Sequence, residues 1–322
     1  MLTSLGFYVY LDLFLLDYRL RHQNHLRVPT CVIFNPAARG NKARHFRRYL
    51  DEIGGRAALK ATAAPGDARR LAAEAIHDGF DTIAAAGGDG TVNEVLNGIG
   101  DAKAFGKARL GVLPLGTVNV FARELKIPLK IEYAWEILTR KREIILDLPQ
   151  VEFSQNGSAL KRFFIQLAGA GLDARAIELV DWNTKKAIGP LAYVVAGLKA
   201  LKERKPRIKA AESANNGYEG ELVLIGNGKF YGGPYDIFPQ ADLKDGLLDV
   251  CVVPRADWPT LFGCIPNFVT RQRLAEKLVK RFRAASFEVS GETKAAFQLD
   301  GEGIGHLPAK FSIAPEKLRV VA

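Results

Sequence analysis

The chain has 322 residues, 48% of them hydrophobic and 25% charged, a composition that excludes a disordered chain and allows two domains of ordinary size. Its formal net charge of +10 favours an anionic partner. Because no nucleic-acid-binding module is visible, we expect a membrane surface and no nucleic acid. The three cysteines (Cys31, Cys251 and Cys264) lie far apart, which excludes the common zinc spacings and indicates a reducing, cytoplasmic compartment.

Residues 2–20 form an apolar N-terminal stretch. No basic residue precedes it, no small-residue cleavage site follows it, and Asp12 and Asp17 interrupt it. These features argue against a signal peptide and against a membrane-spanning helix. Two interpretations of this extension (1–27) stay open: an interfacial anchor, or a segment packed on the body of the protein or on a second copy. We therefore expect peripheral membrane association and leave a homodimer open.

Strands and helices alternate from residue 28 to 142. Strands are predicted at 30–34, 57–61, 81–86 and 109–113. Helices are predicted through Phe46, Leu50 and Ile53, from Gly66–Asp67 with Asp67 as N-cap, over 91–99, and briefly after Thr117. This alternation is typical of an open, mainly parallel α/β sheet, in which ligands bind where turns follow the strands.

The pattern changes after about residue 143. Short strands are predicted around 144–148, 151–153, 163–167, 221–225, 247–253 and 287–289, with a helix at about 187–201. The segment 143–303 is thus a mainly antiparallel, β-sandwich-like second domain, and residues 304–322 are expected to return to the first. In the basic segment 271–283, Leu274, Leu278 and Phe282 have helical spacing. Such a helix would lie on an anionic bilayer or pack on the core with a solvated basic face.

The turn Gly87-Gly88-Asp89-Gly90-Thr91 lies where the strand at 81–86 ends and the helix at 91–99 begins. Its glycines allow the backbone to approach a ligand, and the start of the helix directs free N–H groups at an anion. Asp89 is placed to hold a metal ion or a phosphate-side hydroxyl. The turn predicts a nucleotide phosphate site with magnesium, and an ordinary tight turn is the alternative.

Residues 87–93 (Gly-Gly-Asp-Gly-Thr-Val-Asn) resemble the signature of the diacylglycerol kinase catalytic family of lipid kinases, and NAD kinases share this core more distantly. Residues 114–123 (Pro-Leu-Gly-Thr-Val-Asn-Val-Phe-Ala-Arg) resemble a second family motif. They depart from it at Val120, where the family usually has aspartate, and this weakens the case for diacylglycerol specificity. The resemblance extends from about residue 28 to the C-terminus.

The resemblance implies an ATP site in the first domain. It would be formed by the loop after the first strand, a threonine after the second strand, the turn at 87–91 (the phosphate turn) and the 114–123 motif. The implied residues are Asn35, Pro36, Arg39, Thr62, Gly87, Gly88, Asp89, Gly90, Thr91, Asn93, Gly116, Thr117 and Asn119.

Three further segments resemble family motifs in the second domain. The segment 242–250 implies a structural magnesium bound by the Asp245 carboxylate and the carbonyls of Asp242 and Leu247, and a tight turn is the alternative. The glycine-rich segment 168–174 implies close backbone approach near the interdomain cleft, or simply a strand-to-helix turn. The Asp-Gly-Glu sequence at 300–302 implies Glu302 as the general base, with an exposed turn as the alternative.

Together these motifs imply transfer of the ATP γ-phosphoryl group to a lipid hydroxyl, with Mg²⁺ and with Asp89 and Glu302 at the reacting centre. The expected partners are ATP, a lipid substrate (diacylglycerol or a related lipid) and an anionic membrane. An NAD kinase-like enzyme and a catalytically inactive lipid- or nucleotide-binding relative stay open as alternatives.

Overall fold

The computed structural model describes residues 30–36, 41–140, 142–179, 196, 199–203, 205–213, 216–260, 262–263, 274–291 and 295–322. Side chains of residues 41–45 are left aside. The expectations for the N-terminal extension, for Arg39 and for most of the helix at 187–201 lie outside the described residues.

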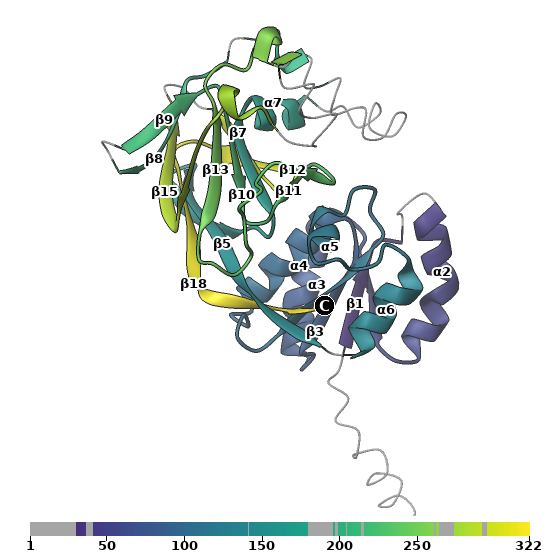
Figure 1. The fold of residues 1–322 in the computed structure, drawn as a ribbon. Coiled ribbons are helices and arrows are strands. Elements are labelled where there is room, and N and C mark those ends of the chain that lie inside the picture. The colour runs from purple at the N-terminus through teal and green to yellow at the C-terminus, as the bar shows by residue number, and fades with distance from the viewer. Residues whose placement is uncertain are drawn as a thin grey trace, which may run out of the picture.

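The first part of the described chain is a parallel sheet with helices on both sides (Figure 1). Its strands, in spatial order, are β2 (Ala58–Ala61), β1 (Thr30–Phe34), β3 (Thr82–Gly87) and β4 (Arg109–Pro114). Its helices are α2 (Asn41–Gly54), α3 (Asp67–His77), α4 (Asp89–Asp101), α5 (Val120–Glu124) and α6 (Ile131–Arg140). β3 and β4 are buried along their whole length, as strands with helices on both faces are. The predicted parallel α/β arrangement is therefore confirmed.

The rest of the described chain is rich in antiparallel strands. The parallel sheet continues beyond β4 into β18 (Ala309–Val321), β15 (Ser286–Gly291), β8 (Ile208–Ser213) and β9 (Asn216–Gly220). Off this order, β5 (Glu143–Gln155) pairs with β18, and β6 (Ser158–Phe163) pairs with β5.

A second sheet has the order β14 (Lys280–Ala284), β13 (Leu248–Val253), β10 (Leu222–Gly226), β7 (Leu167–Gly171), β16 (Ala296–Leu299) and β17 (Glu302–His306). The small elements are α7 (Leu172–Glu178), the hairpin of β11 (Phe230–Tyr231) and β12 (Tyr235–Asp236), and the 3₁₀-helix η1 (Glu276–Leu278). The expected β-sandwich-like second part is confirmed.

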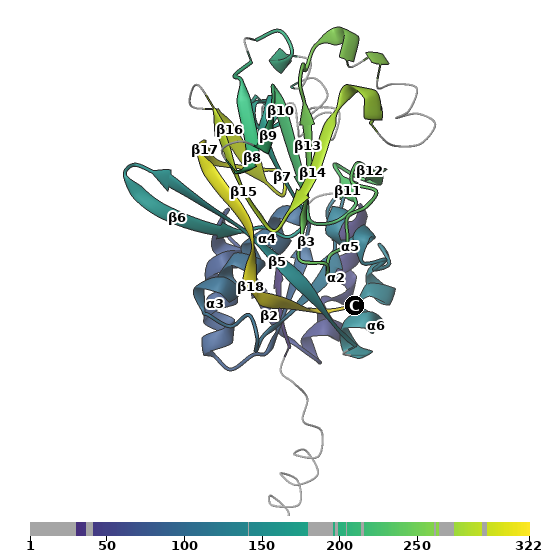
Figure 2. The same cartoon turned by 60° about the vertical axis from the view of Figure 1, so that its left-hand side comes forward.

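β5 and β18 run through both parts of the molecule, as Figure 2 shows for β18. In β5, Leu146 and Leu148 pack in the core of the parallel sheet, whereas Val151 and Phe153 pack in the core of the β-rich part. At the C-terminal end of β18, Arg319 pairs with Arg109 of β4 in parallel register. The chain therefore ends inside the first sheet, and two long strands connect the two cores.

The start of α3 differs from the expected capping. Gly66 occupies the N-cap position with a φ of 88°, and Asp67 is the first helical residue, so the prediction of Asp67 as N-cap is wrong. Asp67 Oδ2 instead accepts hydrogen bonds from the backbone N–H groups of Ala63 (2.7 Å) and Ala64 (2.9 Å). Glycine adopts the left-handed conformation at little steric cost, so the turn closes at Gly66 and the helix begins directly after it.

The strand expected at 163–167 is also wrong. β6 ends at Phe163 and β7 begins at Leu167. Between them, the backbone N–H groups of Ile165 (2.8 Å) and Gln166 (3.0 Å) donate to the carboxylate of Asp300. Those donors are therefore engaged by a side chain instead of a neighbouring strand.

The helix expected at 271–283 is wrong over its described part, 274–283. η1 and the start of β14 occupy it, and β14 pairs antiparallel with β13. The ring of Phe282 packs against Phe287, with the centroids 5.6 Å apart, while Arg283 forms an ion pair with Asp249. The pairing with a buried neighbouring strand outweighs the helical spacing of three apolar residues.

Candidate active site

The two glycine-containing motifs of the first sheet meet at the carboxyl ends of β3 and β4. The backbone N–H groups of Leu115 (2.9 Å) and Gly116 (3.2 Å) both donate to the carbonyl of Gly87. A Cβ atom added to Gly116 would lie 2.5 Å from the Cα of Gly88, so the two turns touch through backbone alone. Glycine is required here because no side chain fits between the two turns. The structure thus brings together segments that are about 30 residues apart.

Asp89 lies between these two motifs. Its Oδ1 accepts a hydrogen bond from the N–H group of Phe121 (3.3 Å), at the start of α5. Burial raises the pKa of Asp89, and hydrogen bonds from the backbone of Val120 and Phe121 oppose that rise. The carboxylate is therefore held against the start of α5, beside the phosphate turn.

Asn119 supplies a further oxygen atom at this place. Its backbone has a φ of 53°, and its Nδ2 donates to the carbonyl of Gly116 (2.7 Å). Its Oδ1 is buried and accepts no hydrogen bond from any described residue. A buried acceptor of this kind is satisfied by an ordered water, an ion or a ligand. An amide oxygen suits a hard cation or its water shell, so the site fits a nucleotide with magnesium.

The other nucleotide-site candidates lie at the same edge of the sheet. Asn35 and Pro36 directly follow β1, and the N–H group of Thr62, after β2, donates to the carbonyl of Phe34 (2.9 Å). Arg47 Nη2 donates to the carbonyl of Pro36 (3.0 Å), which ties that loop to α2. The carboxyl ends of these neighbouring strands are where an α/β sheet binds its ligand.

Asn93 links α4 to the β-rich part. Its Nδ2 donates to Asp300 Oδ2 (2.7 Å) and to the carbonyl of Phe163 (3.3 Å), and the residue is 7% exposed. One turn further on, Asn97 exchanges two hydrogen bonds with the backbone of Phe163, at 2.9 and 3.0 Å. The side chain of Asn93, predicted to contact the nucleotide, thus faces the second part of the molecule.

Asp300 is the buried centre of this link. Besides Asn93, its carboxylate accepts hydrogen bonds from the backbone N–H groups of Ile165 (2.8 Å), Gln166 (3.0 Å) and Leu167 (3.0 Å). Burial raises the pKa of Asp300 to about 6, although these donors favour the ionised form. The Asp-Gly-Glu motif predicts a role for Glu302 and none for Asp300.

Glu302 projects from a tight hairpin between β16 and β17. Leu299 pairs with Glu302, so the loop consists of Asp300 and Gly301 alone, with φ values of 47° and 90°. Two positive φ angles are typical of a type I′ turn, for which Asp-Gly is a preferred sequence. A Cβ atom added to Gly90 would lie 2.5 Å from Glu302 Oε1. The predicted base therefore lies directly against the phosphate turn of the other motif.

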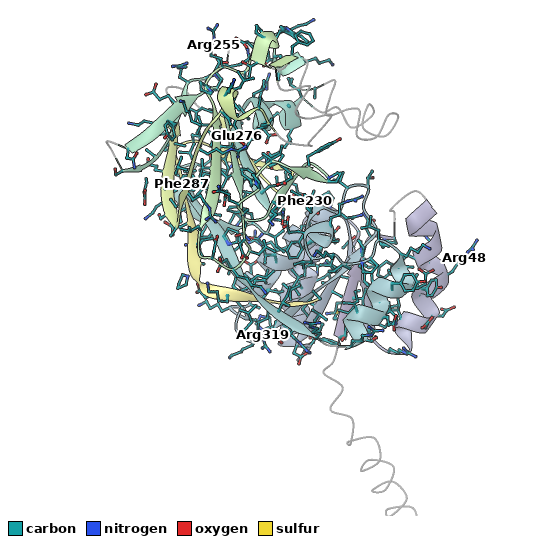
Figure 3. All side chains as sticks on the ribbon, viewed as in Figure 1. Arg48, Phe230, Arg255, Glu276, Phe287 and Arg319 are labelled. Carbon is teal, nitrogen blue, oxygen red and sulfur yellow. The ribbon has the colours of Figure 1, made fainter. Side chains whose placement is uncertain are left out.

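A second contact joins the two parts at α5. Glu124 Oε2 accepts hydrogen bonds from Gln166 Nε2 (2.8 Å) and from the N–H group of Phe230 (3.1 Å). Figure 3 labels Phe230, which lies in β11 next to α5. Glu124 is not predictable from the sequence, because an acidic residue at the end of a short helix carries no distinctive signal.

The loop at 242–247 is closed by its own hydrogen bonds. Lys244 N–H donates to Asp242 Oδ1 (3.1 Å), and Leu247 N–H donates to Asp245 Oδ1 (3.0 Å). Arg283 pairs with the other oxygen of Asp245. Among the described residues, no three His, Cys, Asp or Glu side chains gather as a metal cluster. The carboxylate and carbonyl oxygens are suitable ligands for a hard cation, but an ion would share Asp245 with Arg283.

Comparisons with known proteins show the family of the chain. A family model described as "Diacylglycerol kinase catalytic domain" matches residues 29–151, and one described as "YegS C-terminal NAD kinase beta sandwich-like domain" matches residues 166–322. The chain is 34% identical over 271 residues to a "Probable lipid kinase YegS-like" of Pseudomonas aeruginosa, covering 84% of this chain and 85% of that protein. It is 32% identical over 290 residues to a "Diacylglycerol kinase" of Staphylococcus aureus, covering 87% and 88% respectively.

The fold is shared with a crystal structure of a diacylglycerol kinase from Bacillus anthracis. The TM-score is 0.70 at 24% identity, covering 91% of this chain and 96% of that one. The family model and the named relatives together show an enzyme of the kinase class. The chain belongs to the diacylglycerol kinase catalytic family of lipid kinases, as its motifs predict.

Proposed function

We propose that this enzyme transfers the γ-phosphoryl group of ATP to the hydroxyl of a lipid, diacylglycerol or a related molecule. The observation that carries the proposal is the position of the Glu302 carboxylate against Gly90 of the phosphate turn. A nucleotide held by that turn would present its terminal phosphate to the space beside Glu302. A hydroxyl placed there would have a proton acceptor and a phosphoryl donor on opposite sides.

In this proposal, different residues of the chain bind the nucleotide and accept the proton. The N–H groups at the start of α4 bind the phosphates, with Gly116, Thr117 and Thr62 at the same sheet edge. Glu302 accepts the proton of the attacking hydroxyl, so that the lipid oxygen becomes a better nucleophile. Such a reaction depends mainly on positioning and on charge stabilisation.

Magnesium fits two places in this proposal. At the nucleotide, Asp89 and the buried Asn119 Oδ1 are the oxygen groups that would hold it or its water shell. When bound there, it would neutralise charge on the phosphates. A structural ion at Asp242, Asp245 and Leu247 stays a separate proposal, since that loop lies at the start of β13.

A lipid acceptor also implies contact with a membrane. No helix among the described residues is long and apolar enough to cross a bilayer. The net charge of +10 supports peripheral binding to an anionic surface.

Phosphorylation of a total lipid extract with γ-labelled ATP tests the proposal. We expect a labelled lipid with the wild-type protein, and a loss of about 10²-fold or more in turnover for Glu302→Gln at nearly unchanged ATP affinity, the scale of a lost general base. Glu316→Gln, which removes an exposed carboxylate on β18, is the matched control and should stay at the wild-type rate. Wild-type turnover in Glu302→Gln would contradict the assigned base.

The same assay separates the alternatives. Label transferred to NAD and to no lipid would identify an NAD kinase-like enzyme. ATP binding without transfer to any acceptor would identify a relative that has lost turnover, and Val120 in place of the usual family aspartate would then be the first residue to replace.

A further inference from the structure

A hydrogen-bonded cluster of Asp173, Tyr231 and Gln298 lies beside the hairpin that carries Glu302. Tyr231 Oη donates to Asp173 Oδ2 (2.6 Å), and Gln298 Nε2 donates to both Asp173 Oδ2 and Tyr231 Oη, at 2.9 Å each. The three side chains come from α7, β11 and β16, so the cluster joins three separate elements. None of the roles described above uses it.

The absence of a side chain at Gly169 of β7 leaves space for this cluster. Gly169 of β7 is the cross-strand neighbour of Gln298. A Cβ atom added to Gly169 would lie 2.2 Å from Asp173 Oδ2 and 2.8 Å from Tyr231 Oη. Any side chain at this position would therefore displace the cluster, which explains a glycine in the interior of a strand.

Gln298 connects the cluster to the hairpin of Glu302. Its Oε1 accepts a hydrogen bond from the N–H group of Gly301 (2.8 Å), in the loop directly before Glu302. The side chain is 1% exposed, so its amide cannot exchange these partners for bulk water. Asp173 and Tyr231 fix the position of Nε2, and the amide oxygen Oε1 is consequently held in one orientation. Burial and the neighbouring Asp173 carboxylate raise the pKa of Tyr231 well above its usual value, so that its hydroxyl remains a donor.

We propose that Asp173, Tyr231 and Gln298 are positioning residues that hold the Asp300–Gly301 loop and thereby fix the Glu302 carboxylate over Gly90. Asp173 and Tyr231 act through Gln298, and Gln298 acts through the Gly301 N–H group. The inference rests on the proposed function, in which Glu302 is the proton acceptor. A base must lie within hydrogen-bond reach of its proton, and a displacement of about 1 Å can cost on the order of 10²-fold in rate.

Reversal of the donor and acceptor pattern provides the test. Gln298→Glu keeps the acceptor for Gly301 but places a carboxylate against Asp173 Oδ2. Adding Asp173→Asn supplies an amide donor in return, and the Tyr231 hydroxyl can rotate to donate to the new carboxylate. The double variant thus restores the network with its polarity reversed. Gln150→Glu is the matched control, because Gln150 is also buried and, among the described residues, its amide donates to Ser312 (3.1 Å) and to no residue of the hairpin.

We expect Gln298→Glu to lower kcat by about 10- to 100-fold while the KM for ATP changes less than about twofold, since the N–H groups proposed to bind the phosphates belong to α4 and not to the hairpin. The double variant should recover most of kcat, and the control should keep it. Tyr231→Phe, which removes one donor and is the mildest change, should lower kcat by less. Unchanged kcat in Gln298→Glu, or no recovery in a folded double variant, would overturn the proposal.

Hydrogen exchange of the Gly301 amide separates this inference from the proposed function. It should be protected in the wild type, exposed in Gln298→Glu and protected again in the double variant, whether or not any lipid is phosphorylated. If the wild type phosphorylates no lipid, the proposed function fails, and the exchange pattern still decides the positioning role. Equal protection in all variants would refute that role.

Discussion

Asn93 makes a long-range contact that the local sequence does not predict. The family motif gives it a place at the nucleotide, and that role stays a prediction. In the structure its amide donates to Asp300, more than 200 positions away in the chain. Asn93 lies one turn inside α4, where the helix already faces the β-rich part, and no local sequence pattern encodes such a partner. A buried hydrogen bond between side chains thus joins α4 to the hairpin of Glu302.

The buried carboxylate of Asp300 gives an expected pH dependence. In the unfolded chain it ionises near its usual pKa of about 3.9, whereas the folded protein holds the proton up to about pH 6. The folded state therefore binds more protons between about pH 4 and 6, and this group's contribution to the free energy of unfolding falls as the pH rises through that range. The largest change is about 3 kcal/mol, at ~1.4 kcal/mol per pKa unit.

Urea unfolding of wild type and Asp300→Asn at several pH values measures this contribution. We expect the stability difference between them to shift in favour of the variant as the pH rises from about 4 to 6, and to stay constant above that range. A difference independent of pH would show that Asp300 titrates alike in both states. Asp101→Asn, an exposed carboxylate at the end of α4, serves as the control.

At the scale of elements, the strand–turn–helix units of the first part could be predicted and the hairpin of Glu302 could not. Apolar runs such as 81–86 and the glycines at 87, 88 and 90 are local signals with a direct physical meaning. Asp300-Gly301 is an equally local signal for a two-residue hairpin, but β16 and β17 are short and three of the five residues of β17 are exposed, so neither strand stands out. The helix α6 was missed as well, although Ile131, Ala134, Trp135 and Leu138 form a buried face.

Gly90 tests the contact between the two motifs. Gly90→Ala places a Cβ atom where Glu302 Oε1 lies, and the end of that flexible side chain must move away. We expect a loss of about 10-fold or more in turnover from displacement of the base, with the protein folded. Gly90→Val should also weaken ATP binding in calorimetry. Gly106→Ala, where the added Cβ meets nothing within 4 Å, is the control. Full activity in Gly90→Ala would show that the contact is not needed.

The loop at 242–247 tests the proposed structural cation. If magnesium binds there, it should raise the melting temperature of the wild-type protein without nucleotide, and a chelator should reverse the shift. Asp245→Asn should remove the magnesium-dependent shift, and Asp257→Asn, in a different loop, should keep it. The baseline stability of Asp245→Asn should also fall, because Arg283 loses a partner. Identical magnesium responses in all three proteins would argue against an ion at this loop.

At the scale of the whole molecule, the fold class was predictable and the connection between its parts was not. The change from alternating helices and strands to turn-separated strands is visible in the sequence, and the expected boundary at 142/143 stays a prediction. β5 begins at that boundary but contributes to both cores, and β18 returns more than 150 residues later to pair with it. Register between strands so distant in sequence depends on tertiary packing, which a single sequence does not display.

The charge of the whole molecule gives the last prediction. We expect stronger binding to anionic than to neutral liposomes at about 0.05 M salt, and a steep loss towards 0.5 M as the Debye length shrinks below ~10 Å. Lys277 and Lys280 are exposed in the basic segment, and replacing both with Glu lowers the net charge from +10 to +6. Lys107 and Lys126, exposed on the first part, give a control with the same net charge.

If the basic segment faces the membrane, the variant at Lys277 and Lys280 should bind anionic liposomes much more weakly than the control. If only the total charge matters, the two variants should weaken alike, and the surface would have to be sought elsewhere. Equal binding of the wild type to neutral and anionic liposomes at low salt would contradict electrostatic attachment altogether. Activity on lipid in vesicles should follow the binding, because a membrane-resident acceptor reaches Glu302 only in an attached enzyme.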